Sequence, residues 1–496
     1  MDYSTLFLLF YFILTFVYLT IISGRRNSRL PPGPYPLPII GNLLELGDKP
    51  HCSLATLSKR YGPLMSLKLG SRTTIVVSSP DIAKEFFQTH DQSFSSRSIP
   101  DMAHIMDHAK YSIGWLPAGN QWRKLRRITK EYMFSLQHLD DSEVLRKEKV
   151  QELVNYVAHS VTSEKPVNIG EVVFTTTLNV LSNFLFSKDL AKYDSASAHE
   201  FRDAVWSLLE LVGKPNLADF FPIFKPFDPQ RLLRKANVHG MKIMAILDRI
   251  IDERLQLYNG VNVITTNNDV LDSLLNLTLK DDEFSLNDMR HLFFALFIAG
   301  GDTTSSTLEW AMAELIRNPK KMETTRLEIT KYMQGNNENI KESDISQLPY
   351  LQAVIKEAFR LHPPAPFLVP HQAIRDVEVQ GFIVPQNAQI LCNVWAMGRD
   401  QKIWLNPEAF LPERFLDVKT EYKGQDFELI PFGAGRRMCP GLNMAHRMLH
   451  LILGSLVYKF DWKLEGNMRA VSINMDEKFG LTLSRNAPLF AIPIRL

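Results

Sequence analysis

The sequence predicts a mainly α-helical protein with a minor β portion, preceded by one transmembrane helix. Three observations support this fold class. Helical periodicity dominates from about Gly119 to Pro319, strand-like alternation is confined to short segments before and after that region, and the first residues form an uncharged apolar run. We find no internal repeat and no linker between two globules. We therefore expect a membrane anchor with its basic stop over residues 1–30, a proline-rich hinge over residues 31–44, and one large domain over residues 45–496.

The N-terminal run is the first element. Tyr3 to Gly24 carries no charged side chain, and a helix of this length, at about 1.5 Å per residue, spans about 33 Å, enough to cross a bilayer core. Arg25, Arg26 and Arg29 follow at once, which places the rest of the chain in the cytosol. A cleaved signal peptide is the alternative, but its charges precede the apolar core. The charge order favours an uncleaved signal-anchor and a single-pass protein of the endoplasmic reticulum membrane.

A proline-rich segment follows the anchor. Pro31-Pro32-Gly33-Pro34 cannot continue a helix, so we expect it to turn the chain out of the membrane and to hold the body at a set orientation. A second apolar segment, Leu217 to Phe227, is rich in phenylalanine. Two interpretations of this segment stay open: a second contact with the membrane, or a buried loop between helices.

Shorter elements lie on both sides of the helical region. Leu64–Leu69 and Thr73–Ser78 alternate like two strands. Ser79 and Pro80 then predict a helix start, with a capping hydroxyl and a proline in the first turn. Near the C-terminus we expect a helix over about Gly441–Phe460 and strands within Lys478–Leu496.

The longest predicted helix runs from Leu286 to Arg317, with Ser285 as its N-cap, and at about 48 Å it would cross a whole domain. Its centre, Ala299 to Thr307, contains two adjacent glycines followed by a run of hydroxyl residues. The glycines cost about 2 kcal/mol relative to alanine.

Two interpretations of this weakened centre remain. Glycine permits the close approach of a flat ligand, and a buried threonine can divert a backbone hydrogen bond and open a groove. Asp302 and Thr303 would then form an acid and hydroxyl pair that delivers protons. The alternative is a kink without any chemistry.

The three cysteines are Cys52, Cys392 and Cys439, and their wide spacing excludes a zinc ribbon or a disulfide framework. We interpret Cys52 and Cys392 as small buried hydrophobic residues. Cys439 differs, because Pro440 suits the first turn of the next helix and the positive end of a helix dipole favours a thiolate. Glycines before it free backbone N–H groups to turn towards the sulfur, and Arg437 can pair with a carboxylate of the same ligand.

Two classes of ligand are not indicated by the sequence. The net charge of +2 argues neither for nor against any partner, and nothing suggests nucleic-acid binding, which would need a concentrated basic face. Gly433-Ala434-Gly435 begins like a dinucleotide fingerprint, but Met438 occupies the place of the third glycine, so NADPH is not expected to bind this chain.

Taken together, these residues resemble the cytochrome P-450 superfamily over essentially the whole chain. The motifs occur in the family's order: WxxxR at Trp122 and Arg126, AGxDT at Ala299–Thr303, ExxR at Glu357–Arg360, PERF at Pro412–Phe415, and FxxGxRxCxG at Phe432, Gly435, Arg437, Cys439 and Gly441. The resemblance implies the cytochrome P-450 fold, with residues 45–496 as a haem-thiolate catalytic domain. It also implies haem b as the cofactor, O2 as a cosubstrate and Cys439 as the axial ligand of the iron.

The same resemblance assigns roles to other residues. Asp302 and Thr303 would deliver protons, and Glu357, Arg360 and Arg414 would form a triad beneath the haem. A simple surface ion pair, worth at most about 1 kcal/mol, is the alternative for the triad. The remaining residues implied in binding the haem, the first four through its propionates, are Trp122, Arg126, His371, Arg437, Ala299, Gly300, Phe432, Gly435 and Gly441.

The resemblance also implies a partner. Electrons would come from NADPH through NADPH–cytochrome P-450 reductase. Candidates for its docking surface are the basic residues beside the WxxxR motif, Arg123, Lys124, Arg127 and Lys130. A solvated basic face is the alternative interpretation.

The substrate class follows from a closer resemblance. Phe432–Arg437, Trp310–Leu315 and Asp219–Pro222 are similar to plant microsomal members of the geraniol hydroxylase and ferruginol synthase group, which oxidises terpenoids. We expect Ala295, Phe367 and Val369 to line an apolar pocket, although each can also be a core residue. Three alternatives stay open: hydroxylation of a phenolic substrate such as tyrosine, a non-oxygenative haem-thiolate rearrangement, and a haem-binding carrier without turnover.

Overall fold

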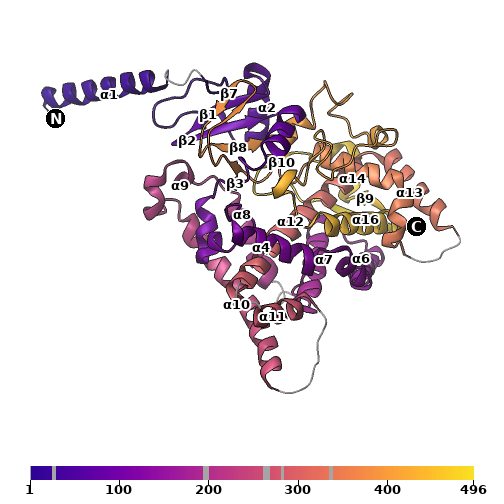
Figure 1. Ribbon diagram of the computed structural model, residues 1–496. Helices are drawn as coiled ribbons and strands as arrows, with labels where there is room; N and C mark the ends of the chain where they lie inside the picture. Colours follow the sequence, from indigo (N-terminus) through magenta and orange to yellow (C-terminus); the bar gives the residue numbers. More distant parts are fainter. Residues whose placement is uncertain (1, 25–28, 194–199, 261–268, 281–283, 335–338) are drawn as a thin grey trace.

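The computed structural model describes residues 2–24, 29–193, 200–260, 269–280, 284–334 and 339–496, and it is mainly helical with a minor β portion, as predicted (Figure 1). The helices are α1 (Tyr3–Gly24), α2 (Pro50–Tyr61), α3 (Pro80–Lys84), α4 (Asn120–Ile128), α5 (Leu136–Asp141), α6 (Glu143–Ser163), α7 (Ile169–Phe186), α8 (Glu200–Val212), α9 (Leu217–Phe220), α10 (Leu232–Gly260), α11 (Val270–Lys280), α12 (Leu286–Arg317), α13 (Pro319–Met333), α14 (Pro349–Leu361), α15 (Val394–Met397) and α16 (Leu442–Lys459). Short tight turns of helix add η3 (Asp101–Lys110), η6 (Pro222–Phe227), η8 (Pro412–Phe415) and η9 (Gly435–Arg437).

The strands form one larger sheet and three small ones. They are β1 (Leu64–Leu69), β2 (Arg72–Val77), β3 (Ser96–Arg97), β4 (Val167–Asn168), β5 (His371–Gln372), β6 (Val377–Val379), β7 (Phe382–Val384), β8 (Gln389–Cys392), β9 (Phe460–Leu464), β10 (Glu477–Lys478), β11 (Ser484–Arg485) and β12 (Phe490–Arg495). The larger sheet has the order β1-β2-β8-β5-β3, in which β1 and β2 pair antiparallel and β2 and β8 pair parallel. The two strands predicted first are confirmed within one residue at each end.

Helix α12 is the centre of the helical part and packs against α7, α10, α14 and α16. Its predicted ends are confirmed, and Ser285 and Asp288 form a reciprocal capping box at its start. The helix continues without interruption through its glycine and hydroxyl centre. The hydroxyls bond within the helix: Thr303 Oγ1 donates to the Ala299 carbonyl (2.8 Å), and Thr304 Oγ1 donates to that of Gly300 (3.1 Å).

The glycines of α12 have neighbours on α7. A Cβ atom added at Gly301 would lie 3.2 Å from the Phe174 ring, and one added at Gly300 would lie 3.4 Å from Leu181. Both neighbours belong to α7. A side chain at Gly301 would press on the Phe174 ring, whereas one at Gly300 would make an ordinary contact with Leu181. The approach of a flat ligand to these glycines stays a prediction.

The N-terminal helix α1 forms over the predicted residues, and its large apolar side chains, from Tyr3 to Tyr18, are exposed. Among the described residues, the helix that meets the length and composition of a membrane span is Ile169–Phe186, but 83% of it is buried inside the protein. It is therefore the core helix α7. The apolar part of α1, Tyr3–Tyr18, is shorter, so the single-pass topology stays a prediction.

The proline-rich hinge is bonded to the first strand. Ser66 donates its backbone N–H to the Pro32 carbonyl (2.9 Å) and its hydroxyl to that of Pro31 (2.6 Å). A Cβ atom added at Gly33 would lie 1.9 Å from the Ser66 carbonyl oxygen, so only glycine permits this close approach. These contacts fix where the chain enters the body.

The apolar segment Leu217–Phe227 lies on the surface in α9 and η6. The exposed fractions of Ile223 and Phe227 are 75% and 68%, which removes the interpretation of a buried loop. Phe220 contributes its carbonyl to the Ser71 backbone N–H (2.8 Å), so the segment is fastened to the turn between β1 and β2.

Candidate active site

One face of α12 is accessible although the helix lies in the core. Phe293, Phe297 and Leu308 on other faces are fully buried. The accessible residues recur at helical spacing and are Ala295, Ile298, Ala299, Asp302 and Thr303, of which Ala299 is exposed and the others are partly exposed. Accessible surface in the middle of a core helix means that this face, which we call the α12 stripe, borders an internal space.

The cysteine loop presents a second accessible surface in the same hydrophobic cluster. Cys439 is exposed, while Ala434 and Leu442 near it in the loop are buried. Ile298 of the α12 stripe and Met438 beside the cysteine pack on one core. Burial raises the pKa of the Cys439 thiol, and the Gly441 backbone N–H and Arg126 lower it. The sulfur is therefore deep in the protein and still accessible, as a metal-ligating thiol must be.

The cysteine loop departs from the prediction in one respect. Helix α16 begins at Leu442 with Gly441 as its N-cap, so Cys439 and Pro440 precede the helix instead of opening it. The net direction of the thiol pKa is upward, because desolvation outweighs the Gly441 N–H and Arg126. The thiolate at Cys439 stays a prediction, because the iron that the sulfur would ligate brings its own charge to this site.

The glycines and the phenylalanine of the loop shape its backbone. Gly435 has a φ of +65°, and a Cβ atom there would lie 2.3 Å from the Phe87 carbonyl oxygen, so the loop can pack on that carbonyl only with glycine. A Cβ atom at Gly441 would lie 3.9 Å from Cys439 Sγ. The Phe432 ring packs edge-on against Phe359 at 5.2 Å. These residues hold the loop that presents the sulfur.

Arg437, from the same loop, lies on the indole of Trp122, with 4.3 Å between the guanidinium carbon and the ring centroid. It donates to the backbone carbonyls of Ser95 (2.7 Å) and Leu116. Arg126, one turn after Trp122 on α4, donates to the Met438 carbonyl. The structure thus brings both residues of the WxxxR motif to the cysteine loop.

His371 and Arg97 complete this basic group. They lie opposite each other on paired strands β5 and β3, and His371 Nδ1 lies 2.8 Å from the Phe94 carbonyl. Arg97 Nη1 donates to the Val369 carbonyl (2.5 Å), whereas its Nε is buried without a hydrogen-bond partner in the described part of the chain. Arg97 was missed by the sequence reasoning, because only the pairing of β3 with β5 relates it to His371. We call Arg97, Arg126, His371 and Arg437 the basic cluster.

The basic cluster carries uncompensated charge. Burial and the neighbouring Arg126 lower the pKa of Arg437 to about 10, although Asp91 opposes this shift. Burial, together with Arg437 and Arg126, lowers the pKa of Arg97, and burial with Arg97 lowers that of His371. Within the described residues, no carboxylate forms an ion pair with Arg97, Arg126 or Arg437. Such a cluster is suited to a ligand that brings its own carboxylates.

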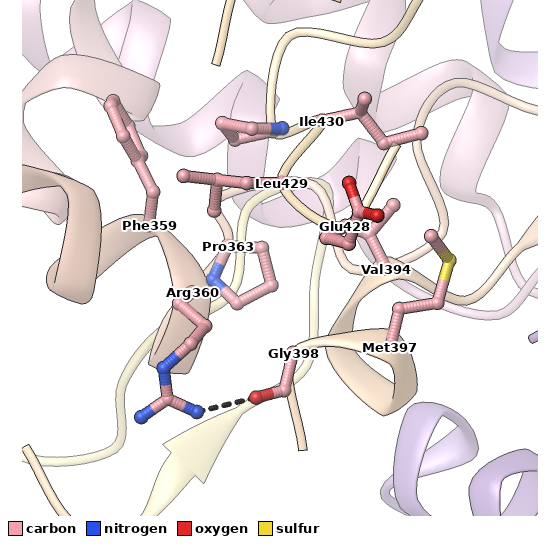
Figure 2. Close-up of a pocket in the computed structure, with 10 residues that line it drawn as sticks. Phe359, Arg360, Pro363, Val394, Met397, Gly398, Glu428, Leu429 and Ile430 are labelled. Atoms are coloured by element: carbon pink, nitrogen blue, oxygen red, sulfur yellow. Dashed lines mark hydrogen bonds between the residues drawn. The ribbon is translucent and has the colours of Figure 1, made fainter. Parts of the chain in front are cut away.

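A second arginine group is fully compensated. Arg360 and Glu357 form a bidentate pair at 2.7 and 2.8 Å, and Arg414 Nε lies 3.1 Å from the same carboxylate. Arg360 also donates to the carbonyls of Gly398, shown in Figure 2, and of Pro407 (2.7 Å). Glu357 and Arg360 are almost inaccessible, so the interpretation as a surface pair does not apply. The adjacent pocket in Figure 2 holds about 10 Å³, too little for a substrate.

Asp302 and Thr303 lie side by side on the α12 stripe. Burial raises the pKa of the Asp302 carboxyl, and the nearby Thr482 hydroxyl opposes that shift. Thr303 shares its hydroxyl proton with the Ala299 carbonyl and keeps oxygen lone pairs free to accept. An acid that readily stays protonated beside a hydroxyl is an arrangement that can hand over protons.

The predicted pocket residues divide into two kinds. Ala295 lies on the α12 stripe. Phe367 is buried in a different cluster, where its ring packs against Phe479 at 5.8 Å, so it is a core residue here. Val369 has a side chain that is 38% exposed, and its carbonyl accepts from Arg97. The structure therefore supports Ala295 most directly as a residue that borders the internal space.

The basic residues in α4 and just after it lie largely on the surface. Arg123, Arg127 and Lys130 are exposed, and Lys124 is half-buried. Arg123 Nη1 donates to the Asn120 side chain at 3.1 Å, and the face carries no acidic side chain from α4 itself. The residues are placed where a docking protein could reach them.

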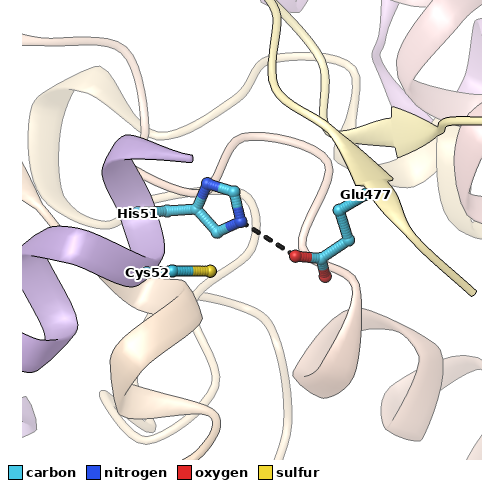
Figure 3. Close-up of side chains that lie close together, drawn as sticks. All are labelled: His51, Cys52 and Glu477. Carbon is cyan, nitrogen blue, oxygen red and sulfur yellow. Dashed lines mark hydrogen bonds and ion pairs between the residues drawn. The ribbon is translucent and has the colours of Figure 1, made fainter. Parts of the chain in front are cut away.

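Three side chains that could ligate a metal, His51, Cys52 and Glu477, lie close together (Figure 3). They belong to none of the motifs described above. Their ligand atoms lie within 4.8 Å of one another, and His51 Nε2 is 2.8 Å from Glu477. However, the Trp395 indole N–H lies 3.0 and 3.1 Å from the two Glu477 oxygens, and Arg399 is 3.5 Å away. The carboxylate is thus already satisfied beside a cation. We interpret the cluster as a buried structural network, with Cys52 half-buried instead of buried as predicted.

Comparison with known proteins agrees with this arrangement. The model of the cytochrome P-450 family matches residues 31–489. A cytochrome P-450 76T24 of Catharanthus roseus is 53% identical over 96% of this chain and 95% of its own length. The geraniol 8-hydroxylase of the same plant is 47% identical over 100% of both chains, and the ferruginol synthase of Salvia miltiorrhiza is 46% identical over 96% of both.

Proposed function

Because this chain belongs to the cytochrome P-450 family of haem monooxygenases, we propose that it hydroxylates a terpenoid or a prenylated plant metabolite, such as a monoterpenol or a diterpene. One observation carries the substrate class: relatives named for geraniol and for ferruginol align with essentially the whole chain. The apolar residues of the α12 stripe suit a hydrocarbon substrate, because burying it there costs no polar group.

The residues present fit a haem. Cys439 would supply the thiolate to the iron, and Arg97, Arg126, His371 and Arg437 would hold the two propionates. The orphaned Nε of Arg97 and the mutual repulsion of the cluster support this assignment, because two carboxylates would satisfy both. Thiolate-ligated haem activates O2 with electrons from a reductase that draws on NADPH.

The residues of α12 would manage the protons of that reaction. Asp302, whose burial favours the protonated carboxyl, would hold a proton at its carboxylate oxygen and pass it to Thr303. The Thr303 hydroxyl would accept that proton on its oxygen and give up its own towards the internal space. Phe293 and Phe297, fully buried beside this face, would keep bulk water away from the pair.

The membrane and the reductase complete the proposal. Helix α1 would anchor the chain in the endoplasmic reticulum membrane, with residues 31–44 as the hinge and the domain of residues 45–496 in the cytosol. The exposed Ile223 and Phe227 support a second contact with the bilayer. The exposed Arg123, Arg127 and Lys130 support docking of an acidic reductase.

The test uses microsomes that contain this protein and a plant NADPH–cytochrome P-450 reductase. We would supply geraniol, an abietane diterpene, a prenylated quinol and tyrosine, with ¹⁸O2 and NADPH, and measure label in the products by mass spectrometry. Microsomes with Cys439→Ser serve as the control, since this change removes the thiolate and its carbon monoxide spectrum.

Labelled product from one of the first three substrates, but not from the Cys439→Ser microsomes, is the expected outcome. Product from tyrosine alone would replace the terpenoid by a phenolic substrate. No labelled product from any substrate, despite a normal thiolate-type carbon monoxide spectrum, would remove the terpenoid assignment.

A further inference from the structure

Asp91, which belongs to none of the motifs and is not part of the basic cluster, contacts the cysteine loop. Its Oδ1 accepts a hydrogen bond from the Arg436 backbone N–H (3.2 Å), and its Oδ2 lies 2.9 Å from Arg436 Nε. A Cβ atom added at Gly435 would lie 2.6 Å from Asp91 Oδ1, so the two segments are in close contact. One carboxylate therefore holds both the backbone and the side chain of a residue three positions before Cys439.

The chain around Asp91 is fixed by contacts that do not involve the cysteine loop. The Ser93 N–H donates to the His90 carbonyl (2.9 Å) and closes a turn that contains Asp91. The rings of Phe86 and Phe94, on either side of this turn, are fully buried and stack at 4.3 Å. Asp91 therefore extends towards the loop from a segment that is anchored in the core.

The contact satisfies a helical turn that has no cap of its own. The N-cap residue of η9 is Ala434, whose methyl side chain cannot accept a hydrogen bond. The Arg436 N–H is the second of this turn, a group that an N-cap side chain usually satisfies, and here Asp91 accepts from it. Just after the turn, the Cys439 N–H donates to the Phe432 carbonyl (2.9 Å) and closes the loop. The position of η9 thus determines where the loop presents the sulfur.

We propose that Asp91 is a positioning residue for the haem ligand: it caps η9 in place of Ala434 and so holds Cys439 at the iron. The inference rests on the proposed role of Cys439. Of the two contacts of the carboxylate, the bond to the backbone N–H fixes the loop. The ion pair contributes little, because the Arg436 side chain is 51% exposed and water screens its charge.

Two substitutions separate the cap from the ion pair. Asp91→Asn keeps an oxygen for the Arg436 N–H and removes the charge, and asparagine caps a helix about as well as aspartate. Asp91→Glu keeps the charge within reach of the flexible Arg436 side chain, but its extra methylene moves the carboxylate out of the capping position. Asp91→Ala removes both contacts. Arg436→Gln is the matched control, because it removes the ion pair and leaves the capped backbone N–H in place.

The measurement needs no substrate. It is the rate at which the full-length holoprotein loses its thiolate-type carbon monoxide spectrum, at a denaturant concentration where far-UV circular dichroism shows that the protein is still folded. Asp91→Ala should lose the spectrum about five- to tenfold faster than wild type, the effect of one lost helix cap, and Asp91→Glu about two- to fivefold faster. Asp91→Asn and Arg436→Gln should stay within about twofold of wild type. If Asp91→Ala takes up no haem, the order of the asparagine and glutamate variants decides the question.

Three results would overturn the inference. The ion pair would hold the loop if Asp91→Glu kept the wild-type rate while Asp91→Asn and Arg436→Gln both lost the spectrum faster. Asp91 would stabilise the fold as a whole if the rates followed the midpoint of global unfolding in every variant. It would have no role at the loop if all four variants matched wild type.

Failure of the proposed function is distinguishable from these results. If the substrate class is wrong, no terpenoid or prenylated substrate gives labelled product, while the order of the rates is unchanged. If Cys439 is not the ligand, wild type and Cys439→Ser give the same carbon monoxide spectrum.

Discussion

Two groups of arginines in this molecule, Arg360 with Arg414 and the basic cluster, are compensated in different ways. Arg360 and Arg414 share the Glu357 carboxylate, and backbone carbonyls take up their remaining donors. In the basic cluster, Arg97 and Arg437 find carbonyls but no carboxylate among the described residues, and burial with mutual repulsion lowers the pKa of both.

The difference separates a structural site from a binding site. A buried ion pair with all its hydrogen bonds made is internally complete and needs nothing further. A buried group of cations without a carboxylate is a cost that the fold carries until an anionic ligand compensates it. The same reasoning applies to carboxylates: Glu357 is paired with two arginines, whereas within the described residues Asp302 forms no ion pair.

The largest expected effect comes from breaking the compensated group. Glu357→Gln leaves Arg360 and Arg414 buried without a negative charge, so we expect the free energy of unfolding to fall by about 3–5 kcal/mol. Denaturant unfolding and the yield of protein with a thiolate-type carbon monoxide spectrum measure this loss.

Glu413→Gln is the matched control, because this half-exposed carboxylate of η8 pairs with Lys321 at 2.9 Å and should contribute about 1 kcal/mol or less. Equal losses from the two variants would mean that the buried network contributes no more than a surface pair.

The uncompensated group should respond in the opposite sense. Arg97→Gln removes one of the repelling cations, so the protein without haem should be no less stable than wild type, and we expect a gain of about 1 kcal/mol. Haem affinity should nevertheless fall about tenfold to a hundredfold, the size of one lost charged hydrogen bond. Haem transfer to an acceptor protein and unfolding of the haem-free protein measure the two effects separately. A haem-free Arg97→Gln protein that is much less stable would make Arg97 a structural residue.

The contacts of Glu357, Arg360 and Arg414 could be predicted from the sequence more completely than those of the basic cluster. Glu357 and Arg360 are one turn apart on a helix, so their contact follows from local geometry. The same local rules predicted both ends of α12 to the residue and Ser285 as its N-cap. Arg97 lies in a two-residue strand, and its partner His371 is far along the chain. No local pattern contains that pairing.

Other features that sequence reasoning did not identify also depend on contacts between segments that are far apart in the chain. Gly301 of α12 lies against the Phe174 ring of α7, a neighbour that the periodicity of α12 alone does not identify. Phe367 was expected in the pocket, and the tertiary fold places it in the core against Phe479. The tail segment around Leu483 is held by Ser306 and Trp310 of the distant helix α12, a contact that no local pattern contains.

A smaller effect on stability is expected at Asp302, a carboxylate that has, in the described part of the chain, no arginine partner like those of Glu357. Its folded-state pKa is raised, so the folded protein binds the proton more tightly than the unfolded chain, whose pKa is near 3.8. Stability therefore falls as pH rises from that value through the folded-state pKa, and then stays reduced. Asp302→Asn removes this cost and should be about 1 kcal/mol more stable than wild type at neutral pH, with no gain below pH ~3.8.

Denaturant unfolding of the Asp302→Asn and wild-type holoproteins across pH measures the gain, and product formation should fall in the variant. Asp302 would have to be compensated like Glu357 if the variant were instead less stable at neutral pH.

The smallest expected effect comes from the exposed arginines of α4, whose charges are hydrated. Arg127 is exposed on α4, so Arg127→Glu should change the free energy of unfolding by no more than about 0.5 kcal/mol. At low ionic strength the KM for the reductase should rise about two- to fivefold, because a docking charge is reversed, and the difference should disappear at high salt. Lys320→Glu, the same charge reversal on the exposed start of α13, should leave that KM unchanged. If both variants raise the KM equally, the net charge of the protein governs docking of the reductase, and the α4 face does not. The exposed arginines of α4 would then have no specific binding role, unlike the arginines of the basic cluster.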